Sequence, residues 1–237
     1  MIPLHDDNPT TIRPIITVAF IAICVLVFLW QISHDPRGQQ FIVYRLGAIP
    51  ITLLGYAELN PQIALIPPVI TILTSMFLHG GWMHLIGNML YLWIFGNNVE
   101  DAMGHVRFVV FYLLCGIAAV YAHALPNANS EIPMVGASGA ISGVLGAYLL
   151  LHPQARVLIL IPLGFLSQLV HVKAMWVLGL WFVMQLVSTA LSDPGQGGVA
   201  FGAHIGGFVM GLALIPLFKH RHVPISNPFA STRRIGR

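Results

Sequence analysis

Charged side chains are scarce in this sequence, and the scarcity excludes most soluble classes of protein. The 11 basic and 8 acidic residues make up 8 % of the 237-residue chain, whereas soluble domains carry roughly 25 %. Hydrophobic residues make up 57 %, and the mean hydropathy is +0.80. A single core cannot hide so much apolar surface, so much of the surface must face lipid. The high hydrophobicity excludes a disordered chain, and a net charge of only +3 argues against nucleic-acid binding.

Cysteine and N-terminal basic residues are also few. The two cysteines, Cys24 and Cys115, each lie in an apolar run, so a disulfide framework is not expected. The segment before the first apolar run holds Asp6, Asp7 and Arg13 and lacks the basic start of a secretory signal peptide. We therefore expect the first apolar run to be retained.

The apolar residues fall into six stretches near the length of a membrane-spanning helix, which needs about 20 residues. These stretches are about 14–32, 82–99, 107–125, 136–151, 173–191 and 198–218. All eight carboxylates fall outside or at the margins of the stretches, because a charge inside the membrane is costly. The sequence predicts an all-α, polytopic membrane protein with six transmembrane helices and both chain ends on one side.

Basic residues are distributed unevenly between the two predicted sides of the membrane. Only Arg37 and Arg45 would lie on the side opposite to the termini. The side of the termini would hold Arg13, Arg107, Arg156, Lys173, Lys219, Arg221, Arg233, Arg234 and Arg237. Because positively charged loops stay in the cytoplasm, both termini are predicted to be cytoplasmic. The chain then divides into a cytoplasmic segment 1–13, a membrane domain 14–218 and a basic cytoplasmic tail 219–237.

Two loops are more apolar than loops usually are. Residues 33–81 contain apolar runs that prolines and glycines interrupt, so we predict an interfacial, partly helical loop rather than a further span. The stretch Val157–Val170 is too short for a span and holds Pro162 and Gly164. It is predicted to be an interfacial or re-entrant piece.

Polar residues inside the predicted spans carry the functional signal, because polar groups in lipid are costly unless they are paired. The second span is preceded by His79 and contains His84 and Asn88, which are four residues apart on one helix face. The fourth opens with Gly136-Ala137-Ser138-Gly139, and the sixth contains Ala203-His204-Ile205-Gly206-Gly207. Taken singly, each cluster could serve helix packing or interhelical hydrogen bonding.

Together the three clusters contain the groups that a serine hydrolase requires. A serine hydroxyl becomes nucleophilic when an imidazole takes its proton, so Ser138 and His204 would have to meet. Ser138 begins a predicted helix, where backbone N–H groups lack helical partners and can stabilise an oxyanion. Side-chain donors from His84 and Asn88 could complete this oxyanion hole. Because no Asp or Glu lies within a span, a Ser–His dyad is the simplest arrangement.

Glycines predict that the fourth and sixth spans pack closely. Gly139 and Gly143 share one face of the fourth span, and Gly207 and Gly211 follow His204 on its own face of the sixth. Small residues at this spacing let two helices approach almost backbone to backbone. The contact would bring the histidine ring to the serine hydroxyl.

These residues resemble the motifs of the rhomboid intramembrane serine proteases of the six-helix bacterial type. The similarity covers about residues 79–211. The family's nucleophile motif, Gly-x-Ser-Gly, matches 136–139, and its histidine motif, Ala-His-x-x-Gly, matches 203–207. Its His-x-x-x-Asn pattern matches His84 and Asn88, which implies oxyanion roles for both residues.

At other positions this chain either has the family's recurrent residue or has a different one. His79 and Glu100 match recurrent positions that the resemblance implies to be structural. Ser142 stands where many members have an aromatic ring beneath the imidazole, so another group must support that ring. Ile70-Thr71 replaces a Trp-Arg pair of the first loop, so substrate preference does not carry over.

The resemblance implies hydrolysis of peptide bonds within or beside transmembrane segments of other proteins, without metal or organic cofactor. The implied partners are transmembrane protein substrates and the lipid bilayer, and the implied location is a bacterial plasma membrane. The oligomeric state stays open. One alternative is a non-catalytic rhomboid-like scaffold that binds transmembrane helices through the same polar cleft. Another is a metal or ion transporter using His79, His84 and His204, although no nearby Cys or carboxylate has recognisable ligand spacing.

Overall fold

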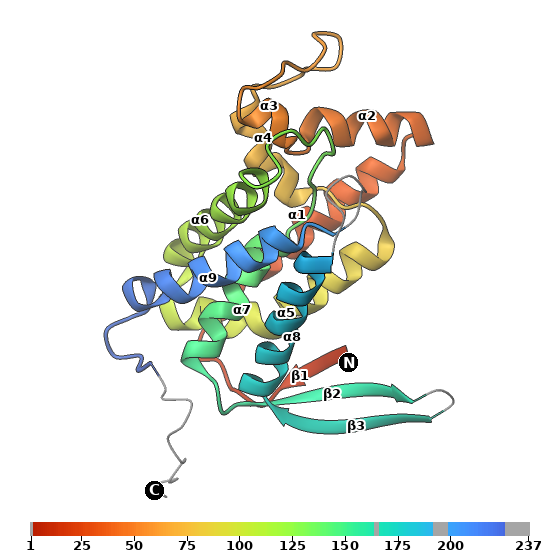
Figure 1. The fold of residues 1–237 in the computed structure, drawn as a ribbon. Helices are drawn as coiled ribbons and strands as arrows, with labels where there is room; N and C mark the ends of the chain where they lie inside the picture. The colour runs from red at the N-terminus through yellow and green to blue at the C-terminus, as the bar shows by residue number, and fades with distance from the viewer. Residues whose placement is uncertain (1, 164–165, 192–198, 226–237) are drawn as a thin grey trace, which may run out of the picture.

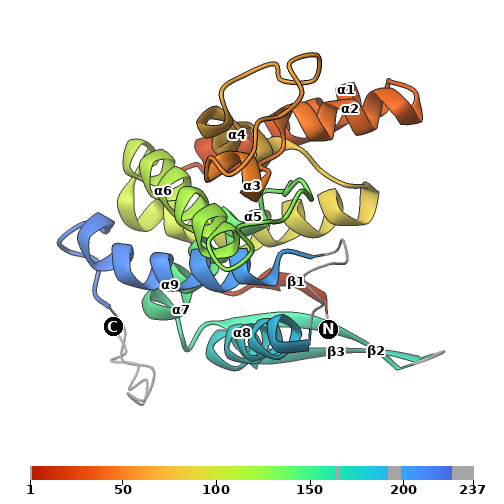
Figure 2. The same cartoon turned by 45° about the horizontal axis from the view of Figure 1, so that its top comes forward.

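Residues 2–163, 166–191 and 199–225 are described by a computed structural model of the chain. The helices form a bundle with two distinct ends (Figure 1). A three-stranded sheet lies at one end, and the short helices of the first loop lie at the opposite end. The turned view in Figure 2 keeps this order, with the bundle between the sheet and the first loop.

Long helices occupy all six predicted apolar stretches. Their bounds are α1 Ile15–Ile32, α5 Trp82–Met103, α6 His105–Ala124, α7 Ser138–Leu151, α8 Ala174–Leu191 and α9 Phe201–Phe218. Helix α7 is the central one, because it packs against α5, α6 and α9 and most of its residues are buried. The prediction of a polytopic helical bundle is therefore confirmed.

Helix lengths support a membrane protein without fixing the number of spans. In the described part of the chain, α1, α6, α8 and α9 are long and apolar enough to cross a membrane. Helix α5 passes the same test together with Pro68–Phe77, from which it is bent by 81°. Helix α7 has 14 residues and is about 21 Å long, less than the roughly 30 Å hydrocarbon core. The count of six spans stays a prediction.

The first loop is partly helical, as the interrupted apolar pattern of 33–81 predicts. It holds α2 Pro36–Leu46, α3 Pro50–Leu53, α4 Pro68–Thr74 and the 3-10 helix η1 Ser75–Phe77. A proline begins each of α2, α3 and α4, where its fixed φ suits a helix start and its missing N–H costs nothing. Three of the prolines in this loop thus begin short helices.

The stretch Val157–Val170, predicted as an interfacial or re-entrant piece, is part of a β-hairpin. Strands β2 Arg156–Leu163 and β3 Leu166–Lys173 pair antiparallel, while Gly164 lies outside the described residues. Val157 and Ile159 are buried in alternation along β2, but the alternate residues Leu158 and Leu160 are apolar as well. The two-residue period of a strand was therefore hidden in the sequence.

The segment before α1 adds a third strand, which the sequence did not predict. Strand β1 Ile2–Asp6 pairs antiparallel with β2. Asp6 is 3 % exposed and accepts hydrogen bonds from the hydroxyl of Tyr148 in α7 at 2.6 Å and from Nδ2 of Asn98 in α5 at 3.0 Å. Burial raises the pKa of Asp6, and the hydrogen bond from Tyr148 opposes that rise. The strand ties the sheet ends of α5 and α7 together.

Glu100 at the end of α5 caps the start of α1. Its buried carboxylate accepts hydrogen bonds from the backbone N–H groups of Ile16 at 2.9 Å and Thr17 at 2.8 Å. These groups lie in the first turn of α1, where helical acceptors are missing and Pro14 provides no side-chain cap. The same carboxylate contacts Nδ1 of His105 at 2.6 Å. Glu100 thus joins three helices at the sheet end.

Basic side chains gather at the sheet end of the bundle. Arg37 and Arg45 lie in α2, at the opposite end. The chain after α9 returns to the end of α5, where the His220 N–H donates to the Ala102 carbonyl at 2.8 Å. The sheet or the neighbouring helix ends carry Arg13, Arg107, Arg156, Lys173, Lys219 and Arg221. The three arginines of the predicted tail beyond these lie outside the described residues.

Candidate active site

Helices α7 and α9 touch through their glycines. A Cβ atom added to Gly207 would lie 1.9 Å from the carbonyl oxygen of Gly139, and one added to Gly211 would lie 2.0 Å from that of Gly143. Any side chain at Gly207 or Gly211 would therefore collide with the backbone of α7. The two helix backbones are in direct contact over the turns that carry these four residues.

This contact places Ser138 beside His204. Ser138 is the first residue of α7, and His204 lies in the first turn of α9. Nε2 of His204 is 2.8 Å from Oγ of Ser138, which is a hydrogen-bond distance. The turn that precedes the serine passes through Gly136, whose φ of +126° favours glycine.

The cluster from α5 packs against the same turn. A Cβ atom added to Gly136 would lie 2.7 Å from Cε1 and Nε2 of His84 and 3.6 Å from Oγ of Ser138, so this imidazole edge lies next to the serine. The backbone N–H of Gly80 donates to Nδ1 of His84 at 3.3 Å. Asn88 is 8 % exposed, and its Nδ2 makes no hydrogen bond to the described residues. The structure thus brings His84 of α5 to the turn that carries Ser138, and Asn88 lies one turn further along α5.

His79 lies behind this cluster and is fully buried. Its ring stands edge-to-face against the His84 ring, with a centroid distance of 5.2 Å. The side-chain amide of Gln31 in α1 donates to the His79 carbonyl at 2.9 Å. His79 therefore connects the end of α1 to the start of α5.

Two residues of α8 contact the His204 ring, and neither was predicted from the sequence. Oε1 of Gln185 is 2.8 Å from Nδ1 of His204, and the Trp181 and His204 rings have centroids 5.9 Å apart. A polar amide within an apolar span is the signal that could have found Gln185. Ser142, at the position of the expected aromatic ring, instead donates its hydroxyl to the Ser138 carbonyl at 2.6 Å.

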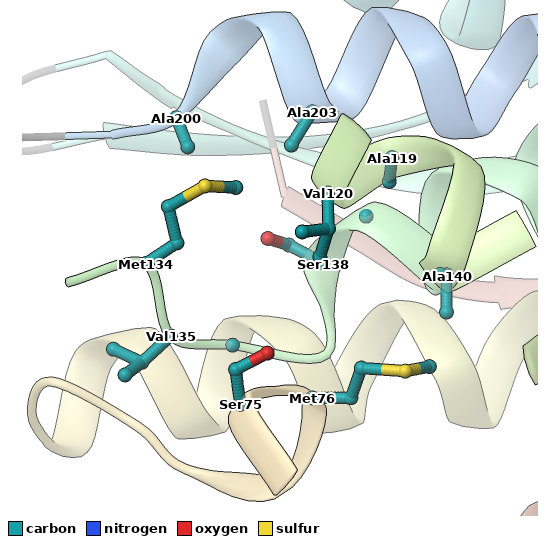
Figure 3. Close-up of a pocket in the computed structure, with 13 residues that line it drawn as sticks. Ser75, Met76, Ala119, Val120, Met134, Val135, Ser138, Ala140, Ala200 and Ala203 are labelled. Carbon is teal, nitrogen blue, oxygen red and sulfur yellow. The ribbon is translucent and has the colours of Figure 1, made fainter. Parts of the chain in front are cut away.

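A small pocket opens beside Ser138. In Figure 3 the serine side chain points into it, with Met134 across from it, Ala203 of α9 above and Ser75 of η1 below. The other lining side chains are mostly small or apolar, and they come from η1, α6, α7 and the segments before α7 and α9. The pocket therefore offers a hydroxyl and space for a small, largely apolar group.

The chemistry available at the site is that of a hydroxyl, two imidazoles and two amides. Within residues 2–163, 166–191 and 199–225, no three His, Cys, Asp or Glu side chains group so that they could hold a metal ion. The 2.8 Å contact between His204 and Ser138 is a hydrogen-bond distance across which an imidazole can take a proton from a serine hydroxyl.

Comparisons with known proteins agree with the motif resemblance. The model of the Rhomboid domain family matches residues 67–221, which include both Ser138 and His204, and the chain belongs to the rhomboid family. It is 34 % identical over 153 residues to the rhomboid protease GluP of Bacillus subtilis (strain 168), covering 64 % of this chain and 27 % of that protein. It is 32 % identical over 152 residues to the mitochondrial Rhomboid protein 1 of Saccharomyces cerevisiae, covering 60 % and 40 %.

A plant relative matches over a shorter region. The chain is 36 % identical to RHOMBOID-like protein 5 of Arabidopsis thaliana over 78 residues, which cover 33 % of this chain and 25 % of that protein. The chain thus spans between 25 % and 40 % of the length of these three relatives.

Replacing Gly207 with Ala should destabilise the protein, because the new Cβ atom would collide with the Gly139 carbonyl. Overpacking of this kind costs about 1–3 kcal/mol, so the melting temperature in detergent should fall by several degrees. Gly179→Ala in α8 is the matched control, since its Cβ atom would meet nothing within 4 Å. Equal melting temperatures for the two variants would contradict the helix contact.

Proposed function

We propose that this chain is an intramembrane serine endopeptidase that hydrolyses peptide bonds within or beside transmembrane segments of other proteins. The observation that carries the proposal is the 2.8 Å contact between Ser138 Oγ and His204 Nε2 inside an apolar helical bundle. Membership of the rhomboid family supports a protease in general.

Ser138 and His204 would carry out the reaction in two halves. First, Oγ of Ser138 attacks the scissile carbonyl carbon while Nε2 of His204 takes the hydroxyl proton. The tetrahedral intermediate collapses to an acyl-enzyme when His204 passes that proton to the leaving amine. Water then attacks the ester with the same nitrogen as its base, which releases the second product and restores the serine. His204 thus takes up and returns one proton in each half of the reaction, and no further acid or base is needed.

Three donors would stabilise the oxyanion. The Ser138 N–H lies at the start of α7, where backbone donors have no helical acceptor. Because Nδ1 of His84 accepts from the Gly80 N–H, the neutral imidazole carries its proton on Nε2, the atom next to Gly136 and the serine. Nδ2 of Asn88 is buried and has no acceptor among the described residues, so it can donate to an oxyanion.

The active site would lie below the membrane surface on the side away from the cytoplasm. The basic sheet end faces the cytoplasm by the positive-inside rule, so residues 1–13 and 219–237 are cytoplasmic in this proposal. Helix α7 runs from Ser138 to the sheet end and is about 21 Å long. Ser138 would then lie about 9 Å inside the opposite face of the hydrocarbon core. The bacterial type of the motifs favours a bacterial plasma membrane.

Coexpression with a tagged single-pass membrane protein should yield cleavage by the unmodified chain. Ser138→Ala and His204→Ala should each reduce cleavage by about 10⁶-fold, to background, because each removes one half of the dyad. The matched controls are Ser33→Ala and His34→Ala, which change exposed side chains in the turn after α1. Immunoblotting of the products gives the result.

Undiminished cleavage by Ser138→Ala would refute the proposed nucleophile. If the unmodified chain retained the tagged protein in a pull-down and never cleaved it, the scaffold alternative would be favoured instead.

Asn88→Ala should lower kcat by about 10²–10³-fold with little change in KM, because an oxyanion donor acts only in the transition state. Steady-state cleavage of a fluorogenic transmembrane peptide in detergent checks this. Gly87→Ala, one residue earlier in α5, adds a Cβ atom that meets nothing within 4 Å and should leave kcat unchanged. A rise in KM with unchanged kcat would show that Asn88 binds substrate rather than the oxyanion.

A further inference from the structure

Gln185 is a buried amide with two hydrogen-bond partners at the active site. It lies in α8 and is 9 % exposed. Its Nε2 donates to the carbonyl of Trp181 at 3.3 Å, and its Oε1 lies 2.8 Å from Nδ1 of His204. A carbonyl oxygen can only accept hydrogen bonds, so the amide nitrogen must face Trp181. The amide oxygen is then the group that faces the imidazole.

This orientation determines which imidazole nitrogen carries the proton. An amide oxygen accepts only, so Nδ1 of His204 must be the donor in the contact with Gln185. A neutral imidazole has one N–H, and Nε2 is therefore left as an acceptor 2.8 Å from the Ser138 hydroxyl. That nitrogen is the one that a general base for Ser138 must use.

We propose that Gln185 is a positioning residue that holds His204 in the tautomer and orientation required for proton transfer from Ser138. The inference rests on the proposed function, because it assigns a task within the same dyad. Gln185 acts through His204 and does not contact the serine. It fills, with a neutral amide, the place that a carboxylate takes in a Ser-His-Asp triad.

Helix α8 also supplies the ring contact that the sequence left unassigned. Ser142 cannot support the imidazole from α7, because its hydroxyl is directed to the Ser138 carbonyl. Trp181 lies one turn before Gln185, and its ring is 5.9 Å from the His204 ring and 6.0 Å from that of Phe208. One face of α8 thus provides both a ring neighbour and a hydrogen-bond acceptor.

A neutral acceptor suits this depth in the membrane. A permanent carboxylate within the span would have to be paired or solvated, whereas an amide carries no charge. Among the residues that the structure describes, the other titratable side chains near His204 are His84 of α5 and His123 of α6, and neither can supply a negative charge. Gln185 therefore orients the base without placing an anion in lipid.

The test compares three variants of the full-length protein with the unmodified chain. Gln185→Leu keeps a similar volume and removes the acceptor, Gln185→Glu keeps an acceptor oxygen, and Met184→Leu changes an exposed neighbour as a control. Gln185→Leu should lower kcat about 10-fold at unchanged KM and melting temperature. Gln185→Glu should recover most of that loss and move the acidic limb of the kcat–pH profile to higher pH, because a carboxylate stabilises imidazolium. Met184→Leu should match the unmodified chain.

A second measurement does not depend on catalytic activity. In protein with nitrogen-labelled histidine, NMR of His204, assigned through His204→Gln, should show a protonated Nδ1 and an unprotonated Nε2. Gln185→Leu should mix the two tautomers.

Equal kcat for Gln185→Leu and the unmodified chain, or the opposite His204 tautomer, would overturn the positioning role. Equal losses in Gln185→Leu and Gln185→Glu would also overturn it, because a merely structural residue would behave in that way. If the unmodified chain cleaves nothing while the expected tautomer is present, the proposed function fails and the positioning contact stands.

Discussion

Direct backbone contact between α7 and α9 is the constraint on which the site depends. Ser138 and His204 have short side chains, so a proton can pass between them only if their helices approach more closely than ordinary side chains allow. Gly207 and Gly211 permit that approach, because any Cβ atom at either position would strike a carbonyl oxygen of α7. Apolar side chains gain little free energy by moving from lipid into a contact between helices. Such close packing is therefore a principal source of helix association in the membrane. The glycine contact therefore determines both how α7 packs on α9 and how close Ser138 lies to His204.

Polar contacts at the sheet end hold the remaining helices around this contact. Asp6 accepts hydrogen bonds from α5 and α7, and Glu100 accepts them from the start of α1. Both carboxylates lie near helix ends, where burial is offset by several hydrogen bonds. At the other end of α7, the described groups around Ser138 are hydroxyl, imidazole and amide. Among the described residues, the bundle thus keeps its acidic anchors at the sheet end and a site without carboxylates at the other.

The sequence was sufficient to predict the long helices, because a segment that crosses lipid must be long and apolar. Long apolar stretches predict the helices, and polar residues inside them mark Ser138 and His204 as candidates. The β-sheet was missed because β2 is apolar on both faces, which hides strand alternation, and because pairing with β1 depends on residues far apart in the sequence. Gln185 was missed because it belongs to no recognised motif, and its meaning appears only when α8 packs against α9. The sequence of one helix alone does not predict its contacts with another helix.

The central claim, that His204 activates Ser138, can be tested without knowing the substrate. A fluorophosphonate reacts with a serine only when a base has made its oxygen nucleophilic. Mass spectrometry of the treated, folded protein should locate the adduct on Ser138 in the unmodified chain and find none in His204→Ala. An unlabelled Ser138 in the folded protein, or equal labelling in the histidine variant, would contradict the account.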